Sequence, residues 1–214
     1  MIRVIRTGSN LAQIAAGVIG DALRDEADRS GRASFAASGG RTPRAVFDAL
    51  AGETVPWSQI DVFQVDERVA PPGDEARNGK GLTEALLDRV PARFHPMPVE
   101  SEDLAGAADR YGNELPRRLD VVHLGLGDDG HTASLVPGDP AVLVDDRDVT
   151  VTEFYRGHRR MTLTRPALDR AGLLVWIVSG GGKGEMVERL LAADPGIPAG
   201  LVSQQRAVLI TDSI

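Results

Sequence analysis

A single histidine lies in the run LGLGDDGHTASLVPG, residues 124–138, among glycines, acidic residues and small hydroxyl residues. An apolar segment stands directly before this run, so His131 would lie just beyond the end of a buried strand. An imidazole has an unperturbed pKa of about 6.5 and can therefore exchange protons near neutral pH. We predict that His131 is a catalytic acid or base and that Asp129, two residues earlier, orients its ring. The competing interpretation is a histidine that only satisfies nearby backbone groups.

Residues 125–130 also fit the dinucleotide-binding pattern G-x-G-x-x-G. In that pattern the last glycine opens a helix whose N-terminus holds a pyrophosphate. Asp128 and Asp129 would bring two negative charges to this anion site, and Pro137 and Pro140 leave little length for the following helix. The glycines therefore indicate a sharp backbone turn beside a ligand, and we expect no nucleotide cofactor.

A metal site at His131 is not favoured by the spacing of possible ligands. The chain has no cysteine, and none of its other three histidines stands three or four residues from His131, as ligands on one helical face would. Carboxylates from distant parts of the chain are the remaining alternative for a hard cation. We expect no metal, because Arg68 directly follows the acidic pair at positions 66–67, and the pair at 128–129 is explained by support of His131.

Three further loops place glycines and basic side chains where an apolar segment ends. The first, SGGRTP, has two consecutive glycines before a predicted helix, and their N–H groups would form an anion cradle beside Arg41. The second, DERVAPPGDEARNGKG, carries two arginines, and the third, SGGGKGE, carries a lysine at a turn. We predict that these loops bind a small phosphorylated ligand through Gly39, Gly40, Arg41, Arg68, Arg77 and Lys183.

Each of these loops also has an ordinary explanation. The glycine pair of SGGRTP is compatible with a common turn that caps a helix. The charged residues 66–68 are compatible with a run that faces solvent, and Lys183 with a lysine that only happens to lie in a turn. Taken together, however, four segment ends with glycines, basic side chains and one histidine suit a phosphorylated ligand of about −1.5 to −2 charges at pH 7.

Short apolar runs alternate with longer helical patterns along the whole chain, and several runs are almost continuously apolar, as strands covered on both faces must be. Strands are predicted over residues 2–6, 33–38, 60–65, 120–126, 148–154, 160–164, 173–179 and 207–211, and helices over 10–33, 42–51, 78–89, 102–118, 165–171 and 182–193. This alternation indicates an α/β fold with a mainly parallel sheet flanked by helices, in one domain over residues 1–214. Segments 66–81 and 136–148 are expected to be irregular loops at strand ends, where open α/β sheets bind ligands.

Composition narrows the class of protein. The formal net charge is −7 with both signs spread along the chain, which argues against a nucleic-acid-binding surface. No apolar run approaches the roughly 20 residues that a membrane helix needs, and the first ten residues lack the apolar core of a signal peptide. With no cysteine for disulfides, we expect a cytoplasmic protein without a membrane or nucleic-acid partner. The sequence leaves its oligomeric state open.

Four motifs resemble those of the 6-phosphogluconolactonase family in order and spacing. They are SGGRTP, PWSQIDVFQVDERV followed by RN, LGLGDDGHTASLVPG, and RMTLTRPAL followed by WIVSGGGKGEMVERLL. The resemblance runs over nearly the whole chain, with DGHTASLVPG as its most specific part, and departs from the usual residues at Arg41 and Val136. It implies the fold shared by glucosamine-6-phosphate deaminases and ribose-5-phosphate isomerases.

The resemblance also implies an activity: the hydrolysis of 6-phosphoglucono-δ-lactone to 6-phosphogluconate in the oxidative pentose phosphate pathway, without a metal or other cofactor. The partner would then be a small sugar-phosphate lactone. Carried over by motif, His131 would be the catalytic base, and Gly39, Gly40, Arg68 and Lys183 would lie around the substrate.

Two other functions are weighed against this one. Glucosamine-6-phosphate deaminases share the glycine–histidine turn, but they have a different continuation, HIAFNEP, and carry DEY where this chain has DER. A sugar-phosphate-binding protein without catalysis is the alternative from another class, and no basic DNA-binding arm is visible that would favour it. A serine hydrolase of the nucleophile-elbow type would need G-x-S-x-G, which the chain lacks.

Overall fold

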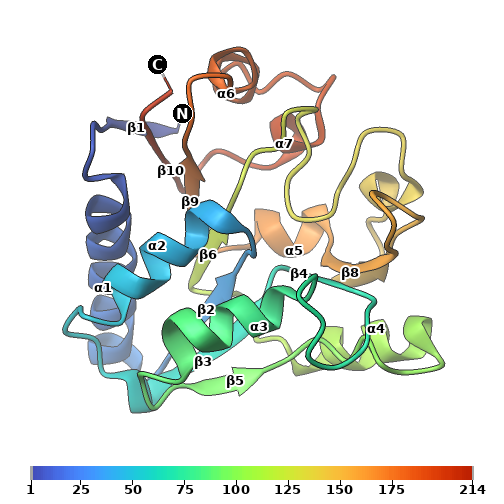
Figure 1. Cartoon of the computed structure of the whole chain (residues 1–214), viewed down its shortest axis with the longest axis horizontal. Helices are drawn as coiled ribbons and strands as arrows, with labels where there is room; N and C mark the ends of the chain where they lie inside the picture. Colours follow the sequence, from blue (N-terminus) through green and yellow to red (C-terminus); the bar gives the residue numbers. More distant parts are fainter. Residues whose placement is uncertain (1, 214) are drawn as a thin grey trace.

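The computed structural model describes residues 2–213, except for the side chains of Arg41 and Thr42. Its main element is a parallel sheet of seven strands in the order β1-β10-β9-β6-β2-β3-β5 (Figure 1). These strands are β1 (Arg3–Arg6), β2 (Ala33–Ala37), β3 (Ile60–Gln64), β5 (Arg93–His95), β6 (Val121–Leu124), β9 (Leu173–Val178) and β10 (Ala207–Thr211).

Helices cover both faces of this sheet, and each face has its own buried cluster. Along the central strands, neighbouring residues alternate between the clusters: Phe35 and Val62 belong to one, Ala36 and Phe63 to the other. One face is covered by α1 (Leu11–Ser30), α2 (Arg41–Leu50) and α3 (Asn78–Leu82), and the other by α4 (Leu104–Glu114), α5 (Arg165–Asp169), α6 (Gly184–Leu191) and α7 (Pro198–Leu201). The fold class predicted from the sequence is confirmed.

A second, antiparallel sheet of three strands stands beside the first. Its order is β4-β8-β7, with β4 at Asp66–Arg68, β8 at Arg160–Leu163 and β7 at Val149–Val151. Val65 joins the two sheets, because its N–H donates to Ala37 of β2 and its carbonyl accepts from Leu163 of β8. The side chains of the small sheet are therefore held close to the carboxyl end of β2.

The strand order reverses direction between β2 and β6. From β2 the chain continues to β3 and β5 on one side, whereas from β6 it continues to β9 on the other. The loops that leave the carboxyl ends of β2 and β6 therefore diverge, and a crevice forms between them. In open α/β sheets such a reversal point is where ligands bind.

The structure differs from the prediction mainly where charged residues form strands. Segment 66–81 is predicted to be irregular, but β4 occupies Asp66–Arg68; the helix predicted over 78–89 is present and begins at Asn78 as α3. β5 was also missed, because the short edge strand RFH has no apolar alternation. The eight predicted strands all occur with slightly different ends, and 136–148 is irregular apart from a 3₁₀ turn at Pro140–Leu143. Two further short turns, a 3₁₀ turn at Trp57–Gln59 and a π turn at Thr83–Leu87, flank β3 and α3.

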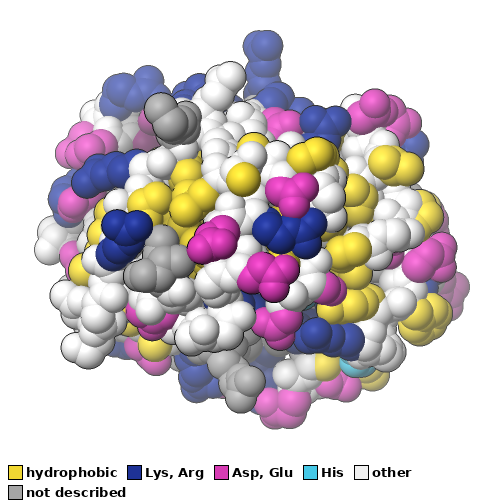
Figure 2. Space-filling model, turned by 90° about the horizontal axis from the view of Figure 1, so that it is seen from above, with side chains coloured by type: hydrophobic (Ala, Val, Ile, Leu, Met, Phe, Trp, Pro, Cys, Tyr) yellow, Lys and Arg dark blue, Asp and Glu magenta, His cyan; other side chains and the backbone are white. Residues whose placement is uncertain are grey.

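The charge distribution on the surface and the composition of the helices relate to the expectations of no nucleic-acid partner and no membrane partner. On the face drawn in Figure 2, basic and acidic side chains are interspersed, as the even spread of charge along the chain suggests. Within residues 2–213, no helix has both the length and the apolar character needed to cross a bilayer.

Candidate active site

A pocket of about 330 Å³ opens at the carboxyl ends of β2, β6 and β9, with side chains of β4 and β8 forming one wall. Five of the eight predicted site residues line it: Gly39, Gly40, Arg68, His131 and Lys183. Asp129 lies behind His131 and contacts its ring. The backbone of Arg41 begins α2 beside the pocket, but its side chain is outside the described part of the chain.

His131 is the first member of a chain of three hydrogen-bonded side chains. Its Nδ1 lies 2.5 Å from Oδ1 of Asp129, and the hydroxyl of Tyr155 donates to Oδ2 of the same carboxylate over 2.9 Å. The rings of His131 and Tyr155 also meet edge to face, with their centroids 5.6 Å apart. Both oxygens of Asp129 are thus engaged, so the carboxylate holds the imidazole in one orientation.

The hydrogen bonds from His131 and Tyr155 determine the protonation state of Asp129. Partial burial opposes its ionisation, but the hydrogen bonds from His131 and Tyr155 outweigh burial and lower the pKa of Asp129 to about 2. The carboxylate is therefore ionised near neutral pH and accepts the proton on Nδ1 of His131. The other ring nitrogen, Nε2, is then the one with a free lone pair.

The loop after β6 folds tightly enough to place these groups. The N–H of Gly127 donates to the carbonyl of His131, and the hydroxyl of Thr132 donates to the carbonyl of Gly125. A Cβ on Gly127 would lie 2.0 Å from Nδ1 of His131 and 2.7 Å from Oδ1 of Asp129. Only glycine therefore allows the backbone to pass behind the His131–Asp129 pair.

Strand β4 divides its three charged residues between two environments. Side chains alternate along a strand, so Asp66 and Arg68 face the pocket while Glu67 points to the opposite side. Asp66 accepts from Ser134 over 2.6 Å and from Asn78 over 3.0 Å. Burial raises the pKa of the Asp66 carboxyl. The alternative interpretation of residues 66–68 as a charged run that faces solvent is therefore wrong, because Asp66 and Glu67 are buried.

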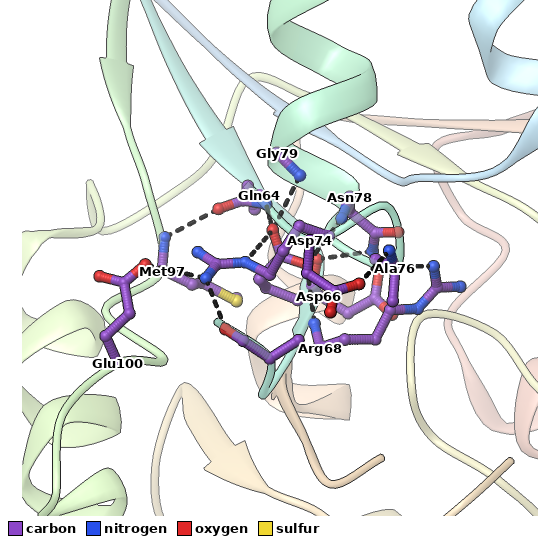
Figure 3. A network of polar contacts seen from close by, with 12 residues as sticks. Gln64, Asp66, Arg68, Asp74, Ala76, Asn78, Gly79, Met97 and Glu100 are labelled. Carbon is purple, nitrogen blue, oxygen red and sulfur yellow. Dashed lines mark hydrogen bonds and ion pairs between the residues drawn. The ribbon is translucent and has the colours of Figure 1, made fainter. Parts of the chain in front are cut away.

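Glu67 is fully buried and organises the outer wall of the pocket. Figure 3 shows the polar network around it, in which Gln64, Asn78 and Gly79 lie close together. Its Oε1 accepts the backbone N–H groups of Arg68 and Asn78, each over 2.7 Å. Its Oε2 accepts the N–H of Gly79 over 2.7 Å and the side-chain amide of Gln64 over 2.8 Å. One carboxylate therefore ties β3, β4 and the start of α3 together.

Arg77 belongs to this network. Its Nε lies 3.4 Å from Oε2 of Glu67, and its Nη1 donates to Glu100 and to the carbonyl of Ala70. The side chain is only 11% exposed, and it is not among the residues that line the pocket around His131. Arg77 instead lines an adjoining cavity of about 400 Å³, together with Gly39, Gly40 and Arg68.

Lys183 reaches the pocket from the loop after β9. Its ammonium donates to the carbonyl of Leu126 over 2.8 Å and lies 2.5 Å from the carboxylate of Asp128. Hydrogen bonding to Lys183 lowers the pKa of Asp128. Lys183 thus bridges the loops after β6 and β9, beside the turn that carries His131.

Three residues of the site were missed in the sequence: Tyr155, Arg156 and Arg160. Tyr155–His158 is a two-residue hairpin turn, with φ of 49° at Arg156 and 85° at Gly157. A left-handed arginine is uncommon and is often found at functional positions. The dipeptide RG between the predicted strands 148–154 and 160–164 is the signal for this turn, whereas the sequence shows Arg160 only as the start of an apolar strand.

No three histidine, cysteine, aspartate or glutamate side chains among the described residues are grouped closely enough to hold a metal ion. The acidic residues considered as distant ligands are engaged otherwise: Asp66 with Ser134, Glu67 with backbone N–H groups, Asp128 with Lys183, and Asp129 with His131.

Comparison with known proteins gives a consistent family. Residues 6–211 match the family model described as glucosamine-6-phosphate isomerases/6-phosphogluconolactonase. The chain is 39% identical over 180 residues to a 6-phosphogluconolactonase of Synechocystis sp., an alignment that covers 77% of this chain and 75% of that protein. It is 35% identical over 211 residues to a 6-phosphogluconolactonase of Caulobacter vibrioides, covering 92% and 90% of the two chains.

Solved structures agree on the fold. A crystal structure of a 6-phosphogluconolactonase from Shewanella baltica superposes with a TM-score of 0.88 at 27% identity, covering 100% of this chain and 97% of the other. A monomeric glucosamine-6-phosphate deaminase superposes with a TM-score of 0.85 at 19% identity, covering 98% and 97%. The likeness to the deaminase shows that the two proteins share a fold.

We expect Glu67→Gln to lower the free energy of unfolding by about 3–5 kcal/mol, because an amide NH₂ would replace an acceptor at which several buried donors converge. Urea unfolding followed by circular dichroism measures the change. Glu100→Gln is the matched control, since Glu100 pairs with the same Arg77 but is 51% exposed. The control should change stability by no more than about 1 kcal/mol. Equal effects of the two substitutions would contradict the role assigned to Glu67.

We expect Asp129→Asn to make the free energy of unfolding depend less on pH in acidic solution. The pKa of Asp129 falls from 3.8 to about 2 on folding, so its carboxylate stabilises the fold above about pH 4, and this contribution is lost as the pH falls toward 2. At pH 7 the variant should be less stable by about 1 kcal/mol, after discounting for solvent screening. Urea unfolding at pH 7, 4 and 3 should show the difference shrinking, and the exposed Asp145→Asn should show no such trend. A difference that grew toward pH 3 would contradict the assignment.

Proposed function

Because this chain belongs to the family of glucosamine-6-phosphate isomerases and 6-phosphogluconolactonases, we propose that it hydrolyses 6-phosphoglucono-δ-lactone to 6-phosphogluconate. The observation that carries the proposal is the His131–Asp129–Tyr155 chain, which opens on a pocket lined by arginines and a lysine. Such a pocket offers a proton acceptor and positive charge together, as the hydrolysis of an anionic lactone requires.

His131 acts as the general base in this mechanism. With Nδ1–H donated to Asp129, its Nε2 takes a proton from a water molecule as the water oxygen attacks the lactone carbonyl carbon. The imidazolium that forms is stabilised by the ionised Asp129. The ring C–O bond of the tetrahedral intermediate then breaks, and His131 returns the proton to the departing ring oxygen, which becomes a hydroxyl group.

Tyr155 positions the base through Asp129. Without its hydroxyl, Oδ2 of Asp129 would lose its 2.9 Å hydrogen bond, and the carboxylate could rotate away from His131. The outer members of such chains usually control orientation rather than chemistry. A lactone is already an activated ester, so one oriented imidazole and a few hydrogen-bond donors suffice for its hydrolysis.

Replacing His131 by alanine should lower kcat by about 10²–10⁴-fold, the usual contribution of a general base. The assay uses freshly generated 6-phosphogluconolactone, with spontaneous hydrolysis subtracted and glucosamine 6-phosphate as the competing substrate. His158→Gln is the control, because His158 does not line the pocket. A kcat near that of the unmodified protein in His131→Ala would refute the mechanism, and turnover of glucosamine 6-phosphate alone would refute the substrate.

We expect hydrolysis to persist at full rate after exhaustive treatment with EDTA, and not to increase on addition of Mg²⁺, Mn²⁺ or Zn²⁺. The reason is that water activation by a metal needs several fixed ligands, whereas the acidic residues of this site are engaged with His131, Lys183, Ser134 and backbone groups. Initial rates before and after chelation measure this. If activity disappeared with chelator and returned with one metal, that metal rather than His131 would be the group that activates water.

A further inference from the structure

A buried histidine contacts the loop that leaves the carboxyl end of β2. His123 of β6 is 0% exposed, and its Nδ1 accepts the backbone N–H of Ser38 over 3.3 Å. Ser38, Gly39 and Gly40 form this loop, and all three line the pocket. The mechanism proposed above does not use His123, so its place beside the loop needs a separate explanation.

The bond to His123 stands where the ladder between β2 and β6 ends. These two strands form only two register pairs, of which the second joins Ala36 with Val122. Beyond this pair the strands separate at the edge of the sheet where the pocket opens. The next N–H group of β2 that faces β6 belongs to Ser38, and the side chain of His123 accepts it. One imidazole nitrogen thus takes the place of a ladder bond.

The surroundings of His123 favour an apolar side chain. Its ring meets that of Phe47 in α2 edge to face, with the centroids 5.8 Å apart, and Val121 on the same face of β6 belongs to an apolar cluster. Burial lowers the pKa of His123 to about 3, so the ring is neutral near pH 7. With Nδ1 as acceptor, the proton lies on Nε2, which is buried and has no hydrogen-bond partner among the described residues. An apolar residue would avoid this unpaired group, so packing does not explain the histidine.

The rest of the loop has few contacts that would fix its path. Within the described part of the chain, no hydrogen bond engages the N–H of Gly39 or of Gly40. The φ of Gly40 is 126°, and a Cβ on Gly39 would lie 2.0 Å from Oδ1 of Asn78. Two glycines in sequence have many accessible conformations, so a defined path requires that the start of the loop be fixed. The bond between Ser38 and His123 fixes that start.

We propose that His123 is a positioning residue of the active site: its neutral imidazole accepts the N–H of Ser38 and thereby holds Gly39 and Gly40 in the conformation that receives the substrate. His123 does not line the pocket, so it acts only through the loop. The competing interpretation is a histidine that merely fills space between β6 and α2. The identity of the substrate rests on the proposed function, but the effect of His123 on the loop is measurable without substrate.

Three variants separate the hydrogen bond from packing. His123→Leu keeps an apolar side chain of similar length and removes the acceptor, whereas His123→Asn places an amide oxygen near the position of Nδ1 and keeps it. Val175→Ala is the control, because Val175 is the register partner of His123 on β9 and is fully buried in the same cluster as Val121. Val175 does not line the pocket, so this change disturbs packing beside His123 and leaves the bond to Ser38 in place.

Amide hydrogen exchange followed by NMR reports on the loop without any ligand. We expect exchange at Ser38 to be about tenfold faster in His123→Leu than in the unmodified protein, because this N–H loses its acceptor. His123→Asn should restore protection. Val175→Ala should not raise exchange at Ser38 by more than it raises exchange at Phe35, in the middle of β2. Unchanged exchange at Ser38 in His123→Leu would overturn the proposal.

Steady-state kinetics with 6-phosphogluconolactone connect the loop to the site. His123→Leu should raise KM by about 3- to 10-fold, the usual contribution of one neutral hydrogen bond, and change kcat far less. His123→Asn should recover the KM of the unmodified protein. A histidine that only fills space would give the reverse, a lower kcat through loss of folded protein at constant KM, as expected for Val175→Ala. That pattern in His123→Leu would refute the positioning role. If the unmodified protein does not hydrolyse the lactone, the proposed function fails, and exchange at Ser38 still decides the role of His123.

Discussion

The buried carboxylate of Glu67 is the interaction on which the pocket wall depends. It accepts hydrogen bonds from three backbone N–H groups and one side-chain amide, and it forms an ion pair with Arg77. The Glu67 side chain has no solvent exposure. Apart from Gln64 of β3, the donors of these hydrogen bonds belong to β4 and α3, which are poor in apolar residues, so packing alone would not hold these two elements in place. Because side chains alternate along β4, fixing Glu67 on one side of the strand places Asp66 and Arg68 on the other.

The site thus combines two sheets that are stabilised by different interactions. The large parallel sheet is held by burial on both faces and delivers the loops that carry Gly39, His131 and Lys183 to one edge. The small sheet is held by polar contacts and adds Arg68 and Arg160 from the side. Val65 locks the two systems together through backbone bonds to β2 and β8. Arg68 and Arg160 are consequently presented by strands, whereas His131 and Lys183 lie on loops that are held by hydrogen bonds to neighbouring groups.

Sequence patterns predicted what depends on local signals. Continuous apolar runs located the central strands, and glycines at their ends located the loops around His131 and Lys183. The patterns failed where long-range pairing decides structure: residues 66–68 look like a solvated loop until β8 pairs with them. The sequence could not distinguish Arg77 from Arg68, because the ion pair of Arg77 with Glu67 depends on the path of the loop 69–77. Tyr155 and Asp129 are 26 residues apart in the sequence and meet only in the folded protein, so no local sequence pattern predicts their hydrogen bond.

The order of strands also constrains how the chain is made. Within the described residues, β1 pairs with β10 alone, so β1 finds its sheet partner only after the later segment Ala207–Thr211 has been synthesised. Until then β1 has no sheet partner, and β9 lacks its neighbour on that side. Synthesis proceeds at about 5–20 residues per second, so the growing chain spends many seconds with an open sheet edge. Closure of the sheet therefore waits for the pairing of Arg3–Arg6 with Ala207–Thr211, and until that pairing forms the open edge of β9 is exposed to aggregation.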